Sequence, residues 1–184
     1  MLELFRGHGH HRQARLFHQF HLAQDFVGFN YYFTVYFKGI SRKNPSRYNR
    51  HHTGQRGPHK RNRRNPPGPR SDLGWYMEPE SLYKEIMAVA RRYKKPILIT
   101  ETGVADAKDQ YRQWWLEQTL EAIAKANDNH AHVIGYFVWS LLDNFEWAQG
   151  WWPKFGLVEV DRENGMKRKV RPSAEWLAKY INGH

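Results

Sequence analysis

The sequence predicts an α/β protein with a parallel sheet, and three observations support this class. Short apolar runs at 97–100 and 132–139 are bounded by turn and polar residues, as buried parallel strands are. Apolar positions recur near a 3.6-residue period over 79–94 and 109–126, which indicates amphipathic helices. Both apolar runs end in polar residues, and strands that alternate with helices in this way form parallel β/α units.

The other elements follow in chain order. A dense run of β-branched and aromatic residues at 25–37, DFVGFNYYFTVYF, predicts the first strand. Pro79 suits the first turn of the helix over 79–94, whose basic end suits the helix dipole. Residues 155–161 and 167–170 predict a hairpin across Asn164-Gly165. Pro172 then opens a last helix that runs to about Ile181, so about three β/α units fit within residues 25–184.

Composition excludes several classes of protein. The chain has 184 residues and no cysteine, which rules out disulfides and thiolate metal sites. It shows neither a signal-peptide pattern nor an apolar run long enough to cross a bilayer, so we expect a soluble, cytoplasmic protein without a membrane partner. Residues 1–24 form an atypical His-rich segment. Its histidines lack acidic partners that would orient metal ligands, and we expect no metal site there.

The net charge of +11 comes mainly from one stretch of the chain. Residues 44–70 carry seven Arg and one Lys with no acid, whereas residues 71–184 carry 15 bases and 16 acids. The stretch is rich in Pro, Gly and Asn and cannot form a core, so we expect a basic, disordered loop. It can be interpreted as a nucleic-acid-binding arm or as a coding sequence read out of frame, and we favour the second interpretation. A nucleic-acid partner is therefore not expected.

Glu101 is the first candidate catalytic residue. It follows the apolar run Pro96–Thr100 directly and precedes Thr102-Gly103, which turns the chain away. In a β/α barrel, a carboxylate at the C-terminal end of a strand lies on the catalytic face. The alternative is a glutamate that caps a loop or the following helix, and this stretch alone does not separate the two.

Four segments together resemble the C-terminal portion of glycoside hydrolase family 1, the β-glucosidases and β-galactosidases. They are DFVGFNYY, SDLGWYMEPESLY, ILITETGVAD and VIGYFVWSLLDNFEWAQGWWPKFGLVEVD. The resemblance covers residues 25–43 and 71–184, and leaves out 1–24 and 44–70. It implies a partial (β/α)8 TIM barrel, about the last three of its β/α units, in residues 25–184. It also implies a retaining β-glycosidase that acts on β-glycosides or oligosaccharides without a cofactor.

The resemblance implies a role for each of seven residues. Glu101 is the nucleophile that forms the glycosyl-enzyme, and Tyr32 is the tyrosine that donates a hydrogen bond to it. Substrate would be bound by Asn30, by the indole platform of Trp139, by the pair Glu146 and Trp147, and by the aromatic ring of Phe155. Taken singly, the tyrosine and the two tryptophans are better interpreted as ordinary core residues. The motif in which the tryptophans stand reverses this preference and favours the substrate-binding interpretation.

Two departures from the family pattern bear on activity. Retaining chemistry needs a second carboxyl group roughly 5 Å from the nucleophile. In the family this group lies in an Asn-Glu-Pro motif, which the sequence lacks; Glu78-Pro79 follows Met77 and is not assigned to it. Thr102 also replaces the asparagine that usually follows the nucleophile, and we expect it to keep a polar turn there.

Three hypotheses follow for the chain. It is a β-glycosidase fragment that is inactive alone or needs another chain with the missing barrel half. Alternatively, it is a non-catalytic sugar-binding or interaction module, or, least favoured, a basic nucleic-acid-binding protein.

Overall fold

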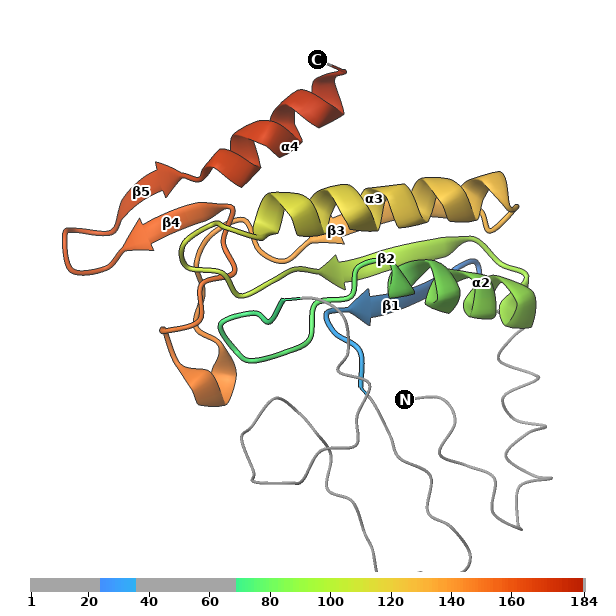
Figure 1. Cartoon of the computed structure of the whole chain (residues 1–184), viewed down its shortest axis with the longest axis horizontal. Coiled ribbons are helices and arrows are strands. Elements are labelled where there is room, and N and C mark those ends of the chain that lie inside the picture. The colour runs from blue at the N-terminus through green and yellow to red at the C-terminus, as the bar shows by residue number, and fades with distance from the viewer. Residues whose placement is uncertain (1–23, 36–68, 184) are drawn as a thin grey trace, which may run out of the picture.

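The computed structural model describes residues 24–35 and 69–183, which form three parallel strands that alternate with two helices, followed by a hairpin and a last helix (Figure 1). The parallel sheet has the order β1-β2-β3, with β1 at Val27–Tyr31, β2 at Ile97–Thr102 and β3 at Val133–Val138. The helices are α2 (Ser81–Tyr93), α3 (Arg112–Asp128) and α4 (Pro172–Asn182). The hairpin joins β4 (Val158–Asp161) to β5 (Lys167–Val170). The α/β class with parallel strands is confirmed.

The ends of the elements follow local signals in the sequence. Helix α2 begins two residues after Pro79 and ends at Tyr93; the capping residue Lys94 that follows takes a left-handed conformation with φ 52°. Pro172 is the first residue of α4, as expected of proline at a helix start. The hairpin turns at 162–166, where Gly165 has φ 69°. The first strand is shorter than expected, because β1 ends at Tyr31 and Tyr32 already lies beyond it.

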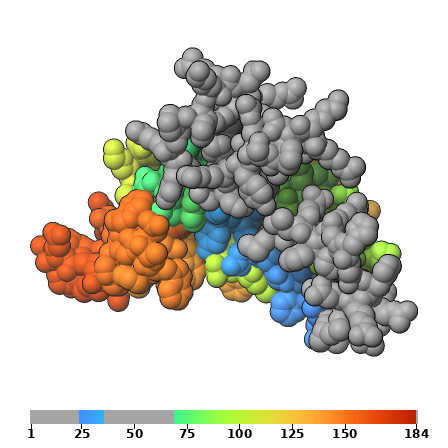
Figure 2. All heavy atoms as spheres, turned by 90° about the horizontal axis from the view of Figure 1, so that it is seen from below, coloured from blue at the N-terminus to red at the C-terminus, as the bar shows by residue number. Residues whose placement is uncertain are grey.

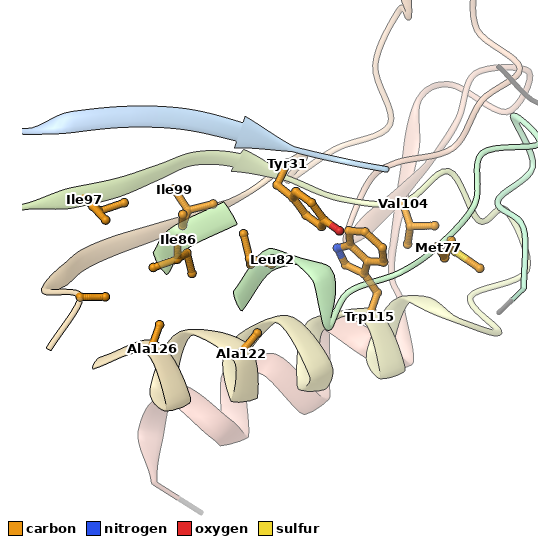
Figure 3. Close-up of a cluster of buried hydrophobic side chains, with 11 residues drawn as sticks. Tyr31, Met77, Leu82, Ile86, Ile97, Ile99, Val104, Trp115, Ala122 and Ala126 are labelled. Carbon is orange, nitrogen blue, oxygen red and sulfur yellow. The ribbon is translucent and has the colours of Figure 1, made fainter. Parts of the chain in front are cut away.

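The core lies between the sheet and the two helices α2 and α3 (Figure 3). Ile97 and Ile99 of β2 are fully buried on the helix side of the sheet, and the buried Trp115 of α3 belongs to the same cluster, where it lies beside Tyr31. The Tyr31 and Trp115 rings stack with centroids 5.9 Å apart. Alternate residues of β2 therefore face the helices, which is the period-2 pattern of a strand.

The opposite face of the sheet is open among the described residues. Ile134 and Phe137 of β3 are 53% and 58% exposed, although both are large apolar residues in a parallel strand. Parallel sheets are normally covered on both faces. The described residues form three adjacent strands and do not close a barrel, so the face that a barrel would enclose is exposed here.

The C-terminal segments lie at the end of the sheet where the strands stop. In Figure 2 the orange and red residues form one side of the molecule, next to the blue segment around β1. The loop between β3 and β4 pairs with itself: Leu157 N donates to Ser140 O at 2.8 Å, and Val158 N donates to Leu141 O at 2.9 Å. The start of the loop adjoins the C-terminal end of β2, because Trp139 N donates to the carbonyl of Thr102 at 2.7 Å.

Two expectations concern residues that the structure does not describe. The His-rich segment 1–24 and the basic loop 44–70 lie outside the described residues, apart from residues 24, 69 and 70. Among the helices of the described residues, none is long and apolar enough to cross a bilayer. The cytoplasmic location stays a prediction.

Candidate active site

A β-bulge at the end of β2 turns Glu101 away from the helices. The pairing of β1 with β2 runs Phe29 to Ile99 and then Asn30 to Glu101, so Thr100 is an extra residue in β2. Bulges re-aim side chains in this way and are frequent next to active sites. As a result, Thr100 and Glu101 both bond to the β1 segment, whereas Ile99 before them and Thr102 after them are buried on the helix side.

Tyr32 is the direct partner of Glu101. Its hydroxyl donates a hydrogen bond to Glu101 Oε2 at 2.7 Å. Burial raises the pKa of Tyr32 well above its ordinary value, and the hydrogen bond to Glu101, the charge of Glu101 and the charge of Glu146 raise it further. The phenol therefore stays protonated and remains a donor to the carboxylate throughout the neutral pH range.

Two aromatic rings contact the ring of Tyr32 and each other. The Tyr32 ring meets the Phe155 ring edge to face, with centroids 6.0 Å apart, and it meets the Trp75 ring at 6.1 Å. Trp75 and Phe155 lie 6.2 Å apart, and Phe155 is only 1% exposed. Edge-to-face contacts at these distances are favourable, so the rings hold Tyr32 in place. Sequence reasoning gave Trp75 no role, although it lies in the quoted segment SDLGWYMEPESLY.

Trp139 lies immediately beside the turn that follows Glu101. Its backbone N–H donates to the carbonyl of Thr102 at 2.7 Å, and a cis peptide bond joins it to Ser140. A Cβ atom added to Gly103 would collide with the carbonyl oxygen of Trp139. The backbone of β2 and the residue after β3 therefore approach each other as closely as a glycine permits.

Glu146 and Trp147 lie in the loop between β3 and β4. Asn144 Nδ2 donates to Glu146 Oε2 at 2.9 Å, and Asn144 Oδ1 accepts from Ser140 Oγ at 3.0 Å. Glu146 is near enough to Tyr32 for its charge to contribute to the raised pKa of the phenol. Trp147 begins the short 3-10 helix η1 (Trp147–Gln149) and is 82% exposed. The sequence motif contains Asn144, but only the structure shows that it holds Glu146.

Asn30 of β1 is linked to the Glu101 segment of β2. It is paired with Glu101 across the sheet, and its Oδ1 accepts a hydrogen bond from Thr100 Oγ1 at 2.6 Å. The structure thus brings Tyr32, Phe155 and Glu101 into one connected cluster and places Asn30 and Glu146 near it. Trp139 adjoins the cluster through the backbone, whereas the Trp147 side chain extends into solvent.

Thr102 does not lie in a polar turn, contrary to our expectation. It is the last residue of β2, its side chain is fully buried, and its Oγ1 accepts a hydrogen bond from Trp115 Nε1 at 3.1 Å. The bulge explains the difference. With Thr100 as an extra residue, Glu101 faces away from the helices, and the next residue, Thr102, faces α3.

The described residues do not place a second glutamate of an Asn-Glu-Pro motif beside Glu101. Glu78 is buried, and its backbone carbonyl accepts a hydrogen bond from the Tyr31 hydroxyl at 2.5 Å. Tyr31 lies in the core on the helix side of β1, so Glu78 lies with it, away from the face that Glu101 and Tyr32 share. Among the described residues, no group of three His, Asp or Glu side chains is arranged as a metal site.

Comparisons with known proteins show which proteins this chain resembles. Beta-glucosidase 10 of Oryza sativa is 36% identical over 176 residues, which are 86% of this chain and 32% of the rice protein. A chloroplastic benzoxazinyl glucoside beta-D-glucosidase of Secale cereale is 39% identical over 125 residues, 61% of this chain and 22% of that protein. The beta-galactosidase of Pyrococcus woesei is 43% identical over 93 residues, 50% of this chain and 18% of that protein.

Solved structures show the same partial coverage. A hyperthermophilic beta-glucosidase mutant superposes with a TM-score of 0.72 at 36% identity, over 89% of this chain and 36% of that one. The Thermotoga maritima beta-glucosidase in complex with glucoimidazole gives 0.69 at 32% identity, over 86% of this chain and 34% of that one. These neighbours are (β/α)8 barrels, and this chain corresponds to a partial, C-terminal portion of them.

The chain thus spans about a third or less of the length of the curated relatives given above. The family model for glycosyl hydrolase family 1 matches residues 12–184, a wider range than the motifs alone indicated. The chain therefore belongs to glycosyl hydrolase family 1.

Proposed function

We propose that this chain supplies the nucleophile side of a retaining β-glycosidase active site. The observation that supports it most directly is the bulge that brings Glu101 Oε2 within 2.7 Å of the Tyr32 hydroxyl. Among the described residues, Oε1 of Glu101 receives no hydrogen bond, so it is the oxygen available to attack an anomeric carbon. The substrate class is a β-glycoside or β-linked oligosaccharide.

In this mechanism, Oε1 of Glu101 forms a bond to the anomeric carbon while the glycosidic C–O bond breaks. The leaving oxygen takes a proton from a second carboxyl group, and water later cleaves the glycosyl-enzyme with that group acting as base. Tyr32 keeps the nucleophile in one orientation by its hydrogen bond. Phe155, Trp139 and Trp147 offer aromatic surface to the sugar, and Glu146 and Asn30 offer polar groups for its hydroxyls.

The second carboxyl group has to come from the remaining β/α units of the barrel. The exposed Ile134 and Phe137 on the open face of the sheet support this, because a barrel encloses that face. General acid and base assistance typically contributes 10²–10⁴-fold to the rate. We therefore expect this chain alone to hydrolyse even an activated aryl β-glucoside far more slowly than a complete enzyme. A polypeptide that carries the other units is the partner expected to restore activity.

A trapping reagent tests the nucleophile without the missing acid. A 2-deoxy-2-fluoro-β-glucoside with a 2,4-dinitrophenolate leaving group needs no proton donor and should leave a stable sugar ester on Glu101. Mass spectrometry of the intact chain and of its peptides locates the label. Glu101→Gln should abolish it, and a label on any other residue, or turnover that survives Glu101→Gln, would refute the assignment.

A non-catalytic sugar-binding role is the second candidate. The highly exposed Trp147 and the half-exposed Trp152 support it, since aromatic faces stack on sugars. It predicts saturable binding of a β-glucoside without covalent labelling, lost in Trp139→Ala. Labelling of Glu101 by the trapping reagent would exclude it.

A further inference from the structure

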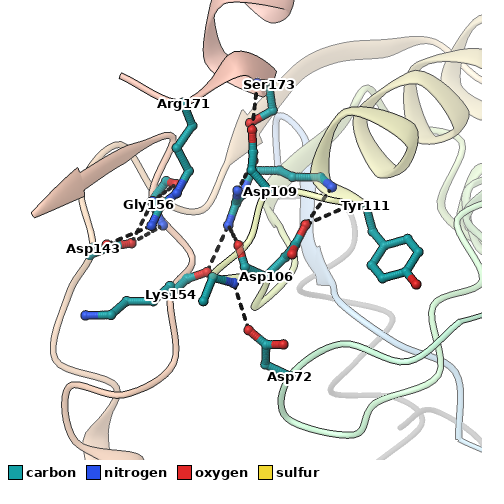
Figure 4. Close-up of polar contacts among 11 residues, drawn as sticks. Asp72, Asp106, Asp109, Tyr111, Asp143, Lys154, Gly156, Arg171 and Ser173 are labelled. Carbon is teal, nitrogen blue, oxygen red and sulfur yellow. Dashed lines mark hydrogen bonds and ion pairs between the residues drawn. The ribbon is translucent and has the colours of Figure 1, made fainter. Parts of the chain in front are cut away.

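We propose that two buried arginines, Arg171 and Arg112, are positioning residues that fix the β3–β4 loop against the Tyr32–Glu101 pair. They hold the backbone on either side of Phe155 (Figure 4). Neither arginine belongs to the motifs that indicated the family. That the positioned residues serve catalysis rests on the proposed function. That the arginines fix the loop rests on the contacts alone.

Arg171 binds the residue after Phe155 and the start of the loop together. Its Nη1 donates to the carbonyl of Gly156 at 2.6 Å. The same guanidinium makes a two-pronged ion pair with Asp143, with Nη1 to Oδ1 at 3.0 Å and Nη2 to Oδ2 at 3.1 Å. Both side chains are about 5% exposed or less. Paired, parallel N–H···O bonds of this kind fix direction as well as distance.

The packing around Gly156 leaves little freedom for the loop to shift. Asp143 Oδ1 also accepts from the backbone N–H of Gly156 at 3.0 Å. A Cβ atom on Gly156 would lie 2.6 Å from the carbonyl oxygen of Val158 and 2.7 Å from the carbonyl carbon of Leu142. The two arms of the loop are thus in direct backbone contact where Arg171 binds them.

Arg112 binds the residue before Phe155. Its Nη2 donates to the carbonyl of Lys154 at 2.9 Å and to the carbonyl of Asp106 at 2.7 Å. The carbonyl of Lys154 also accepts from the backbone N–H of Asp106 at 2.9 Å. Arg112 is 1% exposed, lies at the start of α3 and forms an ion pair with Asp109. Phe155 therefore lies between two carbonyl groups, each bound by a buried guanidinium.

The arginines are connected to the candidate site by two routes. The first runs through Phe155, whose ring contacts Tyr32, the residue that donates to Glu101. The second runs through the loop itself: Asp143, which Arg171 holds, is followed by Asn144, which donates to Glu146. Displacing the loop would move Phe155 and Glu146 together, and the Tyr32 ring would lose one of its two aromatic neighbours.

Substitutions at Arg171 test the inference, with Arg168→Gln as the matched control. Arg168 lies three residues earlier on the exposed strand β5, so its loss removes the same charge without touching the loop. Arg171→Lys keeps the positive charge opposite Asp143, so the variant should fold. It cannot reproduce the three directed hydrogen bonds of the guanidinium, so the loop should lose its fixed position. Arg171→Gln removes the charge and leaves the buried Asp143 carboxylate without its ion-pair partner.

The direct readout is ¹⁹F NMR of the chain labelled with 5-fluorotryptophan, with resonances assigned by Trp→Phe substitutions. Trp75 contacts both Tyr32 and Phe155 and reports on the site, whereas Trp115 stacks on Tyr31 in the core and serves as the internal reference. In Arg171→Lys we expect the Trp75 and Trp147 resonances to shift or broaden while that of Trp115 stays in place. Arg168→Gln should change none of them.

A binding measurement connects position to function. Calorimetric titration with deoxynojirimycin should show at least a tenfold loss of affinity in Arg171→Lys and no change of affinity in Arg168→Gln. If the Trp75 resonance and the affinity are unchanged in a folded Arg171→Lys variant, the inference is wrong. It is also wrong if Trp115 shifts as much as Trp75, because Arg171 would then support the whole fold. If the unsubstituted chain binds no deoxynojirimycin, the proposed function fails, and the ¹⁹F comparison still decides the positioning role.

Discussion

At the end of β2, two consecutive side chains lie on opposite sides of the sheet. Glu101 accepts a hydrogen bond from Tyr32, and Thr102 is buried against Trp115 of α3. One side chain therefore belongs to the candidate site and the next to the core. Neighbouring residues of a strand alternate in this way, and the extra residue Thr100 decides that Thr102, and not Glu101, faces the helices.

At this scale we predict the effect of removing the Tyr32 hydroxyl. Tyr32→Phe keeps the ring among its aromatic neighbours but leaves Glu101 without its donor. A hydrogen bond to a charged group contributes about 1.5–3 kcal/mol, so the rate of trapping at Glu101 should fall about 10- to 100-fold. Mass spectrometry at timed intervals measures the rate. Tyr180→Phe, on the exposed face of α4, should leave it unchanged; an unaltered rate in Tyr32→Phe would mean that the hydroxyl does not orient the nucleophile.

The second residue-scale prediction concerns acid stability. Burial alone would raise the pKa of Asp109, but hydrogen bonds from Ser173 and the charge of Arg112 outweigh burial and lower the pKa. Asp109 Oδ2 accepts from Ser173 N at 2.9 Å, and Oδ1 accepts from Ser173 Oγ at 2.6 Å. A lowered folded-state pKa means that the stabilisation is complete above the ordinary aspartate pKa of about 3.8 and is lost as pH falls through the folded-state value.

Urea unfolding of Asp109→Asn at several pH values measures this effect. The variant should be less stable than the parent chain by about 1–3 kcal/mol at pH 7, and the difference should shrink below pH 4. A difference that stays constant down to pH 2 would show that the charge of Asp109 does not stabilise the folded state.

At the scale of the elements, the site depends on how closely the loops after the strands approach one another. Gly103 lets the end of β2 pass beside the carbonyl of Trp139, and Gly156 lets the two arms of the β3–β4 loop meet. Both glycines have an ordinary backbone conformation, so the requirement at these positions is space and not a positive φ.

We therefore predict that Gly103→Ala affects the site as well as stability. The added methyl group meets backbone atoms, which cannot rotate away, so overpacking should cost about 1–3 kcal/mol and should move Trp139 and Glu101 apart. The melting temperature and the rate of trapping at Glu101 should both fall. Gly165→Ala in the hairpin turn is strained by its φ of 69° and should lower stability alone. Equal trapping rates in the two variants, measured well below both melting temperatures, would contradict the prediction.

At the scale of the whole molecule, the sheet is covered on one face and open on the other. Helices α2 and α3 bury Ile97 and Ile99, while Ile134 and Phe137 on the other face are more than half exposed. The outer strands β1 and β3 are each paired on one side only among the described residues. Unpaired strand edges beside apolar surface favour association between chains.

We predict that the purified chain self-associates through this face at micromolar concentration. Replacing Ile134 and Phe137 together by Thr should reduce the association without disturbing α2 and α3, because these side chains lie on the far side of the sheet. Sedimentation velocity measures the change, and Ile181→Thr, at an exposed position on α4, is the control. A monomer with a cooperative thermal transition before any substitution would show that the open face needs no cover.

Complementation tests the partner. Co-expression with the N-terminal two-thirds of the Thermotoga maritima beta-glucosidase should yield a complex that hydrolyses an aryl β-glucoside, and Glu101→Gln should abolish this activity. If the complex forms but remains inactive, the chain is a binding module and not half of a catalytic site.

The order of strands and helices, the parallel sheet and the position of Glu101 at the end of a strand followed from the sequence, because periodicity and local turn signals act over a few residues. The pairing of Tyr32 with Glu101 was implied by resemblance to the family, since no local pattern links residues 69 positions apart. Tertiary structure alone showed the bulge at Thr100, the place of Trp75 beside Tyr32, the burial of Thr102 and the two arginines around Phe155. Each of these features depends on the register between strands or on contacts between distant segments. No short stretch of the chain determines that register or those contacts.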